Sequence, residues 1–573
     1  MFKFAKSILD AVFGKKRPLE TDEDDQEQQA SENKRQKMTM VYRVKVNNLP
    51  RAEMEGIRTF FKKMGYVRVS KAPRWTYAFI SVDTEQEAQE CVKTINECVY
   101  KNTPLSAEIL IQTEDEFRNR SNTRTKRRKG SNKDEIENDA RTPAEKLSDQ
   151  VTPMWRKSYD IQLKDKNNKG IRQLVTLKKR VTELTKTARD PSQIEWALQK
   201  GRLPCEVLDP VPSPQTNGYR TKCEFTIGKD LDGEPTVGFL LGLYREGVTS
   251  VLDPSECLHI PDIAKKIAKA MCDYIRQSGL PVYDRVTKEG YWRTLMTKTQ
   301  STGDILVLVQ MRDEDLSSER VEEIKKDLIR FWNEESGVKV TTLLFQSWNG
   351  ASNGFTDKAP IDILTGDGYI YENLLDCRFR LSASAFFQVN TPATELLYSK
   401  CAEWCNIDKE KKTTLLDLCC GTGTIGITMA KSVDRVIGIE MVPEAIVDAK
   451  ENAKLNDIKN VTYYADKVEN KIDIVQNEEN EEVIAVLDPP RNGVHASVIR
   501  AIRKAKHIDR VIYISCDAKQ AFNNFLGLCR PESNSFVGMP FKPARAISFD
   551  LFPHTDHCEL MIEFVRIKDN LQE

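Results

Sequence analysis

Residues 415–426 read LLDLCCGTGTIG, and this stretch decides the fold of the C-terminal third of the chain. It opens with the apolar run 415–418, which is typical of a buried strand, and continues into Gly421, Gly423 and Gly426 before a helical segment follows. Glycines at this spacing let the backbone turn tightly and approach a ligand at the start of a helix. The stretch therefore predicts a strand, a ligand-binding turn and a helix.

An acidic residue stands where such a turn would need one. Glu440 closes the next apolar run, 19 residues after Gly421. A carboxylate at that place can accept hydrogen bonds from both hydroxyls of a ribose. Dinucleotides and S-adenosylmethionine both satisfy this pattern, so the pattern alone does not choose between them. A structural turn followed by a surface glutamate is the alternative at this point.

The C-terminal region alternates apolar strands with helical segments. The strand-like runs are residues 415–418, 436–439, 461–464, 483–487 and 511–514. Regular alternation of this kind predicts a doubly wound, mostly parallel sheet. Ligands of such sheets bind beyond the carboxyl ends of the strands. We therefore expect a Rossmann-like domain over residues 391–573, with its chemistry at those ends.

The choice of cofactor comes from the residues after the fourth run. Asp488-Pro489-Pro490-Arg491 resembles the (Asp/Asn)-Pro-Pro-x signature of methyltransferases that act on planar bases. The prolines stiffen the loop and place the preceding polar residue at the end of the strand. Enzymes that methylate amino groups usually carry an aromatic residue after the prolines. Arg491 therefore favours a different reaction.

Methylation of C5 of uracil needs a thiolate that adds to C6 and a base that later removes the C5 proton. The run 511–514 leads directly to Cys516, at the active edge of the predicted sheet. The loop 549–559 ends in Glu559, at the start of another apolar strand. Taken alone, a cysteine after an apolar strand is more often a structural residue. A lone glutamate there is more often an edge charge.

His554, His557 and Cys558 raise a metal site as an alternative for the same loop. No matching cluster of ligands is visible elsewhere in the sequence, so we expect no metal.

Several motifs together resemble one family. From about residue 219 to the C-terminus, the chain resembles the RNA 5-methyluridine methyltransferases. The resemblance is carried, in the order of that family, by Phe386-Phe387-Gln388-Val389-Asn390, Asp417-Leu418-Cys419-Cys420-Gly421-Thr422-Gly423, Asp488-Pro489-Pro490-Arg491-Asn492-Gly493, Ser515-Cys516 and His554-Thr555-Asp556-His557-Cys558-Glu559. One departure is Cys419, which replaces an aromatic residue found in many members.

The resemblance implies a class I methyltransferase that uses S-adenosyl-L-methionine. It implies Cys516 as the nucleophile and Glu559 as the base. It also implies tRNA as the partner, with the methyl group placed on uridine 54 of the T-loop (m5U54). Asp466, at another strand end, is a weaker candidate for a contact with the adenine. The residues implied around the cofactor are Gln388, Gly421, Gly423, Thr424, Glu440 and Asp488.

Rival hypotheses remain at this stage. Formation of 5-methylcytosine typically uses a second cysteine after the proline of the strand-end motif, and this chain has Pro489 and Pro490 there. The same uridine chemistry on rRNA or mRNA stays open, as does an RNA-binding chaperone or scaffold with a silent methyltransferase fold. An iron–sulfur cluster is not expected, because Cys205, Cys223 and Cys257 lack the close spacing that a cluster needs.

A small α/β module is predicted over residues 41–113. Apolar spacing indicates strand, helix, strand and helix in turn, an order that resembles an RNA recognition motif. In that family, aromatic residues on the two central strands stack bases. Tyr77 and Phe79 fit the second signature, whereas Lys45 stands where the first usually has an aromatic residue. A protein-docking module of the same fold is the alternative.

The expected protein is therefore a multidomain α/β chain with five regions. A disordered tail with basic and acidic runs (1–40) and the module resembling an RNA recognition motif (41–113) precede a charged linker (114–150). An α+β RNA-binding region (151–390) then leads to the methyltransferase domain (391–573).

Composition sets broad bounds on this 573-residue chain. Lys plus Arg (86) balance Asp plus Glu (86), so net charge does not indicate the partner. Basic runs near residues 15–17 and 118–133 are typical either of RNA or nuclear-import contacts or of solvated linkers. We expect a soluble protein of the cytosol, the nucleus or both, with the 14 cysteines as thiols. Protein partners and the oligomeric state are not predicted.

Overall fold

The computed structural model describes residues 40–50, 55–66, 69–71, 76–82, 84–101, 103–113, 141–242, 249–285, 287–350, 352, 354–408, 410–472 and 481–568. Two compact units lie within residues 1–140 and 141–573. Nearly all of the predicted tail, most of the predicted linker and both basic runs lie outside the described residues. Among the described residues, no helix combines the length and apolarity needed to cross a bilayer.

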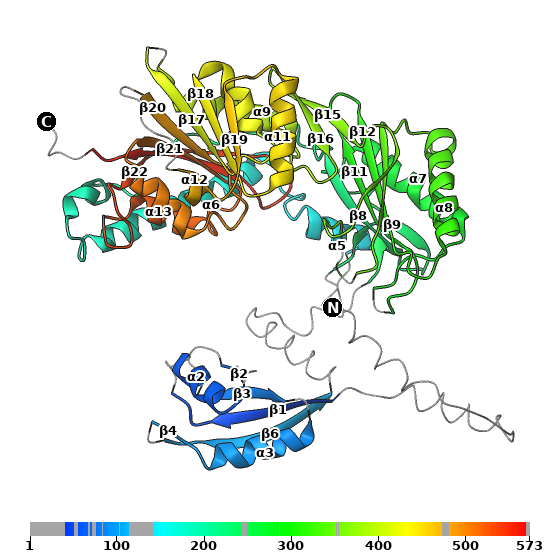
Figure 1. Cartoon of the computed structure of the whole chain (residues 1–573), viewed down its shortest axis with the longest axis horizontal. Helices are drawn as coiled ribbons and strands as arrows, with labels where there is room; N and C mark the ends of the chain where they lie inside the picture. Colours follow the sequence, from blue (N-terminus) through cyan, green and yellow to red (C-terminus); the bar gives the residue numbers. More distant parts are fainter. Residues whose placement is uncertain are drawn as a thin grey trace, which may run out of the picture. The chain divides into compact units, whose positions relative to one another are not determined.

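The first unit is a four-stranded antiparallel sheet with two helices (Figure 1). Its strand order is β2-β3-β1-β6, and both helices contribute to one apolar core. The predicted strands and helices of this segment are present. Its elements are β1 (Met40–Asn47), α2 (Glu55–Lys63), β2 (Val69–Ser70), β3 (Ala78–Val82), α3 (Glu85–Asn96), β4 (Val99–Tyr100), β5 (Thr103–Pro104) and β6 (Ser106–Thr113).

The second unit begins with two helices, α5 (Pro143–Val151) and α6 (Tyr159–Leu184), and a 3-10 segment, Pro191–Leu198. A seven-stranded sheet of order β10-β9-β8-β11-β12-β13-β14 follows. The elements of this lobe are β8 (Lys222–Lys229), β9 (Pro235–Leu240), β10 (Val251–Leu252), α7 (Asp262–Ser278), β11 (Trp292–Thr299), β12 (Ile305–Met311), α8 (Ser318–Arg330), a one-turn extension Phe331–Glu335, β13 (Thr342–Ser347) and β14 (Asp362–Thr365).

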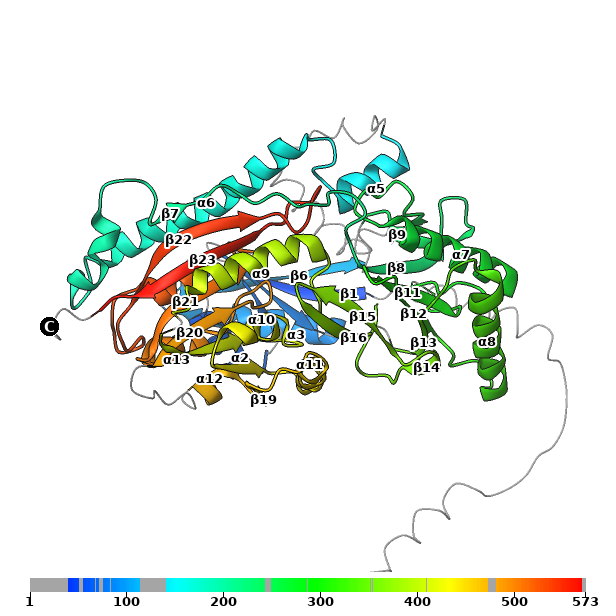
Figure 2. The same ribbon diagram turned by 90° about the horizontal axis from the view of Figure 1, so that it is seen from above.

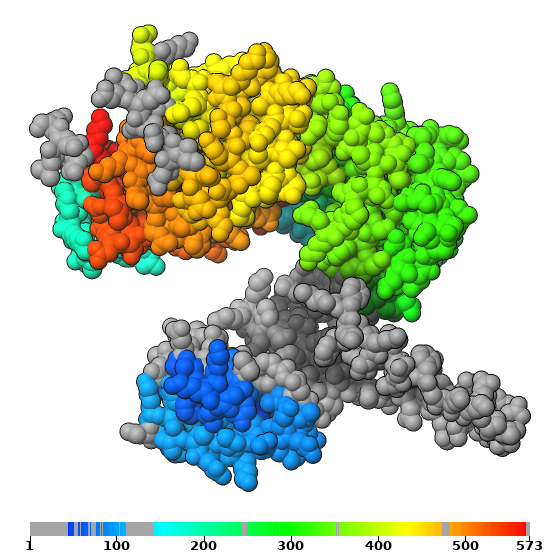
Figure 3. Space-filling model, viewed as in Figure 1, coloured from blue at the N-terminus to red at the C-terminus, as the bar shows by residue number. Residues whose placement is uncertain are grey.

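Apolar residues continue from this lobe into the next without interruption. The hairpin of β15 (Tyr369–Leu374) and β16 (Cys377–Ser382) and the helix α9 (Thr391–Cys405) share one core with strands of both lobes. In the space-filling view, the two lobes of the second unit lie against each other (Figure 3). The site described below is therefore built on a continuous core.

The C-terminal lobe contains an eight-stranded sheet of order β19-β18-β17-β20-β21-β23-β22-β7. The strands β17 to β21 run parallel, as predicted, and β23 enters antiparallel between β21 and β22. The elements are β17 (Lys412–Leu418), α10 (Thr424–Met429) with the turn Ala430–Ser432, β18 (Arg435–Glu440), α11 (Pro443–Leu455), β19 (Val461–Ala465), α12 (Val468–Lys471), β20 (Glu481–Leu487), α13 (Ala496–Lys504), β21 (Ile508–Ser515), α14 (Phe522–Cys529), β22 (Phe541–Phe549) and β23 (Glu559–Arg566).

Two segments from much earlier in the chain complete this sheet. The short strand β7 (Glu206–Val207) pairs parallel with β22 and covers its edge. The helix α6 lies along β22 and β23, as Figure 2 shows. Gly170 makes this close approach possible, because a Cβ there would lie 3.2 Å from Leu560 Cδ1. The sequence did not predict that a helix from residues 151–390 would pack on the C-terminal sheet.

Candidate active site

The register of the sheet brings the predicted site residues to one edge. Leu418, at the end of β17, lies opposite Ile439 of β18 and Leu487 of β20, so Glu440 and Asp488 follow at the same level. On the other side, Ser515 of β21 pairs with Leu560 of β23. The next residues outward are Cys516 and Glu559, which therefore adjoin each other.

The turn after β17 has the conformation that its glycines predict. Gly421 and Gly423 both have positive φ angles, of 53° and 80°. A Cβ on Gly423 would lie 2.4 Å from the Tyr463 hydroxyl oxygen, so a side chain there would also clash. Thr424 opens α10, and its hydroxyl lies 3.1 Å from the hydroxyl of Tyr398. The turn is therefore tight at Gly423, whereas a Cβ on Gly421 would meet open space.

Three carboxylates lie around the turn after β17. Glu440 accepts the backbone N–H of Gly421 at 3.2 Å, and Asp417 accepts that of Gly426 at 2.8 Å. Asp488 accepts the amide of Gln388 at 3.4 Å. Burial raises the pKa values of Asp417 and Asp488 to about 7. Such a site suits a ligand with ribose hydroxyls and a positive centre, and S-adenosylmethionine has both.

The proposed adenine contact, Asp466, lies directly after β19 and stays a prediction. Asp466 accepts hydrogen bonds from the backbone N–H of Lys467 and the side chain of Asn470, which hold its pKa below the usual range. Beside Glu440, Met441 is 65% exposed, an apolar surface that sequence reasoning missed. In the sequence, Met441 is marked only by its position directly after Glu440, the residue expected to bind the ribose.

Cys516 and Glu559 differ in exposure. Cys516 is half-buried and lines a cavity of about 490 Å³. Glu559 is 2% exposed, and its Oε2 has no hydrogen-bonding partner among the described residues. Burial, then the nearby carboxylates of Glu559 and Asp488, raise the pKa of the Cys516 thiol to about 12. Burial and Asp488 likewise raise the pKa of Glu559 well above its usual value.

Arg491 opposes both shifts. Its positive charge lowers the pKa of Cys516 and that of Glu559, although by less than burial raises them. The side chain is exposed and sits in the Asp-Pro-Pro-Arg motif. Sequence reasoning used this residue only to set aside amino-group chemistry, and missed that its charge would lie beside the cysteine.

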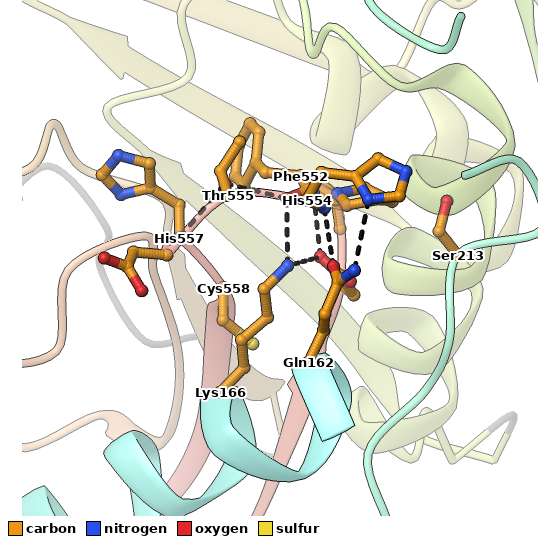
Figure 4. Close-up of polar contacts among 12 residues, drawn as sticks. Gln162, Lys166, Ser213, Phe552, His554, Thr555, His557 and Cys558 are labelled. Atoms are coloured by element: carbon orange, nitrogen blue, oxygen red, sulfur yellow. Dashed lines mark hydrogen bonds and ion pairs between the residues drawn. The ribbon is translucent and has the colours of Figure 1, made fainter. Parts of the chain in front are cut away.

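A buried ion pair fixes the loop that leads to Glu559 (Figure 4). Lys166 of α6 donates to Asp550 Oδ1 at 2.6 Å and to the carbonyl of Phe552 at 2.9 Å. Both charged side chains are 0% exposed. Asp550 also accepts the backbone N–H of Phe552 at 3.1 Å. No local motif marks this pair, so the sequence did not reveal it.

Further contacts hold the same loop from other elements. Gln162 accepts the backbone N–H of His554 at 2.8 Å and lies 3.2 Å from its Nδ1, while Asn217 lies 2.8 Å from its Nε2. Tyr219 donates to the carbonyl of Pro553 at 3.0 Å. Both ring nitrogens of His554 are thus engaged. In the part of the chain that the structure describes, no group of three His, Cys, Asp or Glu residues could hold a metal ion.

Comparisons with known proteins indicate the same family as the sequence motifs. A family model described as tRNA (Uracil-5-)-methyltransferase matches residues 369–566. The chain is 35% identical to tRNA (uracil-5-)-methyltransferase homolog A of Mus musculus, over 92% of this chain and 85% of the relative. It is 34% identical to homolog B of Homo sapiens, over 74% of this chain and 84% of the relative.

One solved structure supports the fold. It is the Pyrococcus abyssi tRNA (uracil-54, C5)-methyltransferase in complex with S-adenosyl-L-homocysteine, with a TM-score of 0.52 and 20% sequence identity. The alignment covers 72% of this chain and 84% of that one. The resemblance predicted from the motifs is confirmed: the chain belongs to the tRNA (uracil-5-)-methyltransferase family.

Proposed function

We propose that this S-adenosylmethionine-dependent tRNA (uracil-5-)-methyltransferase acts on uridine 54 of the T-loop, with Cys516 as nucleophile and Glu559 as base. The observation that carries the proposal is the register of β21 and β23, which pairs Ser515 with Leu560 and so brings Cys516 and Glu559 to adjacent positions at the same edge as the turn after β17. The name of the Pyrococcus abyssi neighbour supports position 54.

The cofactor residues are Gln388, Gly421, Gly423, Thr424, Glu440 and Asp488. Glu440 would accept hydrogen bonds from the ribose, and the backbone of the Gly421 turn would line the cofactor. Asp488 and Gln388 would hold its positive end. When bound, S-adenosylmethionine supplies an electrophilic methyl group. A cation in this acidic pocket also lowers the pKa values that burial raises.

Cys516 begins the reaction as a thiolate. Its sulfur forms a bond to C6 of uracil, and the electron pair of the C5=C6 bond moves toward C5 and the C4 carbonyl. The resulting enolate makes C5 nucleophilic enough to accept the methyl group, as the bond between that group and the sulfonium sulfur breaks and a neutral thioether leaves. Because the free thiol has a pKa of about 12, the positive charge of Arg491 beside it favours the reactive form.

Glu559 completes the reaction. After methylation, C5 carries both a proton and the methyl group, and Glu559 takes the proton. The electron pair of the C5–H bond re-forms the C5=C6 double bond and expels the Cys516 thiolate. The raised pKa makes the Glu559 carboxylate a stronger base, and its unpartnered Oε2 has a lone pair available for this proton.

The first unit has a complementary role as an RNA recognition motif. Tyr77 and Phe79 lie edge to face at 5.5 Å between ring centroids, and both are only half-buried. Lys45, on the neighbouring strand β1, pairs with Glu108 at 2.6 Å and lies 5.6 Å from the Tyr77 ring. Aromatic residues beside a cation on one sheet face suit stacked bases and their phosphates.

A trapping experiment tests the catalytic proposal. A tRNA transcript that carries 5-fluorouridine only at position 54 is incubated with the full chain and S-adenosylmethionine, then run on a denaturing gel. Fluorine cannot leave C5 as a proton, so the enzyme stays covalently bound. We expect a shifted band whose attached peptide contains Cys516. Cys516→Ala should form no band, whereas the matched control Cys272→Ala, on α7, should form it normally.

Other outcomes would change the proposal in defined ways. A band with rRNA or mRNA fragments, but not with tRNA, would keep the chemistry and change the substrate. A band that persists in Cys516→Ala would remove this cysteine from the mechanism. Tight binding of RNA without any band would favour the scaffold hypothesis.

A further inference from the structure

The cavity beside Cys516 has a second wall that the catalytic chemistry does not use. This wall is the exposed edge of α6, a helix that precedes residues 369–566, the segment matched by the family model. Lys169, Arg172 and Gln173 line the cavity from this helix, and Lys519 lines it from the turn after Cys516. The wall therefore faces the nucleophile and is rich in cations.

The basic side chains on and beside this wall differ in whether they already have a hydrogen-bonding or ion-pair partner. Lys169 donates to Asp556 Oδ1 at 2.7 Å, and Lys166 is used by the buried pair with Asp550. Arg172 and Lys519 are exposed, and neither side chain has a hydrogen bond or ion pair within the described ranges. The two carboxylates of the lining also have partners: Asp556 accepts from Lys169, and Asp517 Oδ2 accepts from Gln520 Nε2, both at 2.7 Å. Arg172 and Lys519 are thus available to an anion.

Both cations are held by rigid backbone. Arg172 stands two residues after Gly170, where α6 packs closely on β22 and β23 and a Cβ would lie 3.2 Å from Leu560 Cδ1. Lys519 lies within a turn. In this turn, Asp517 Oδ1 accepts the backbone N–H groups of Lys519 and Gln520, both at 3.1 Å. The cavity of about 490 Å³ is large enough for one nucleotide. A nucleotide with its base at Cys516 would have its phosphates near this wall.

We propose that Arg172 and Lys519 form a phosphate-binding cradle for the RNA backbone on either side of the target uridine. The inference rests on the proposed function and extends it to the substrate. Exposed arginine and lysine side chains position nucleic acids through phosphate oxygens without reading sequence. The cradle would hold the backbone while the base reaches Cys516, so it should govern the affinity for RNA rather than the chemical step.

Charge reversal tests this cradle in the full chain. Arg172→Glu and Lys519→Glu are compared with Arg500→Glu, an exposed arginine on α13 that does not line the cavity. For each cradle variant, the KM for the tRNA transcript should rise about tenfold. The slope of log affinity against log salt should fall by about one. The value of kcat at saturating tRNA and the Kd for S-adenosylmethionine should stay unchanged, and Arg172→Lys should restore most of the affinity.

The outcomes separate the cradle from the catalytic proposal. Equal KM values and salt slopes for Arg172→Glu, Lys519→Glu and Arg500→Glu would overturn the cradle, even if the wild type forms its adduct normally. A loss in kcat without a change in KM would overturn it as well. Weaker, less salt-dependent binding by both variants, together with no adduct from the wild type, would support the cradle and reject the catalytic proposal.

Discussion

The cofactor edge and the catalytic loop sit side by side on one sheet but are built in different ways. At the cofactor edge, the contacts of the turn after β17 join residues close in sequence: Asp417 to Gly426, nine positions apart, and Glu440 to Gly421, 19 apart. The contact of Gln388 with Asp488 spans 100 positions. The catalytic loop depends on a longer link still, because Lys166 is 384 positions from Asp550. The turn at the cofactor edge is thus assembled locally, whereas the loop that leads to the base is held from a distance.

This difference predicts how far the effects of a substitution in each region should extend. A change to the turn after β17 should stay there, because the hydrogen-bonding partners of its backbone lie in β17 and at the end of β18. A change to the anchors of the catalytic loop should reach Glu559 and the stability of the lobe together. Five experiments test this difference.

The largest effect is expected from Glu559→Gln, at the end of the catalytic loop. Loss of a general base typically costs about 10²–10⁴-fold in rate. With ordinary uridine RNA, this variant should accumulate the methylated covalent adduct, visible on a denaturing gel. The Kd for S-adenosylmethionine, measured by calorimetry, should not change. A weakened cofactor affinity would show that the two regions are not independent.

Lys166→Met should lower the free energy of unfolding by about 3–5 kcal/mol, because it leaves Asp550 as an unpaired buried charge. Urea denaturation measures this change. Lys169→Met is the matched control: it removes a partly exposed pair on the same helix, and should have a much smaller effect.

The double variant Lys166→Met with Asp550→Leu sharpens the same prediction. Replacing both buried charges with apolar groups should recover much of the lost stability. Adduct turnover should recover less, because the hydrogen bond from Lys166 to the carbonyl of Phe552 is still missing. Full recovery of turnover would mean that the loop does not need this anchor.

The pH dependence of adduct formation reports on Cys516. Because burial and the neighbouring carboxylates raise its pKa to about 12, the thiolate fraction grows as pH rises toward that value. As long as the pH stays below the pKa of the Cys516 thiol, the rate should rise about tenfold per pH unit. Glu559→Gln removes one of the carboxylates that raise this pKa, so its profile should shift to lower pH. A flat profile from pH 6 to 9 would contradict the raised pKa.

The smallest effect is expected from Glu440→Gln, at the cofactor edge. Loss of one charged hydrogen-bond acceptor should weaken the affinity for S-adenosylmethionine about tenfold. At saturating cofactor, the rate of adduct formation and the stability of the protein should be close to wild type. A large loss of stability would mean that a substitution at this edge has effects as far-reaching as one in the catalytic loop.

The same contrast explains what the sequence could predict. The turn with Gly421 and Gly423, the parallel strands and the level shared by Glu440 and Asp488 follow from local spacing, and the structure contains them. Cys516 and Glu559 were identified through family motifs, and the register places them together. Their catalytic roles stay predictions.

What the sequence missed depends on distant contacts. Lys166 looked like any lysine of a charged helix, since its partner lies near the other end of the chain. The unpaired charges of Arg172 and Lys519 could not be recognised for the same reason: only the packing of α6 on β22 and β23 brings them to one cavity. A helical period predicts which face is buried, but not against which strand it will be buried.

The pairing of β7 with β22 also sets an order of events during synthesis. Residues 206–207 leave the ribosome about 340 residues before their partner strand exists. At about 5–20 residues per second, this interval is roughly 20–70 s. During that time α6 and β7 have no sheet to join, and afterwards β22 remains an open edge until they arrive. The nascent chain therefore has a window in which chaperones and premature self-association compete for the same surfaces.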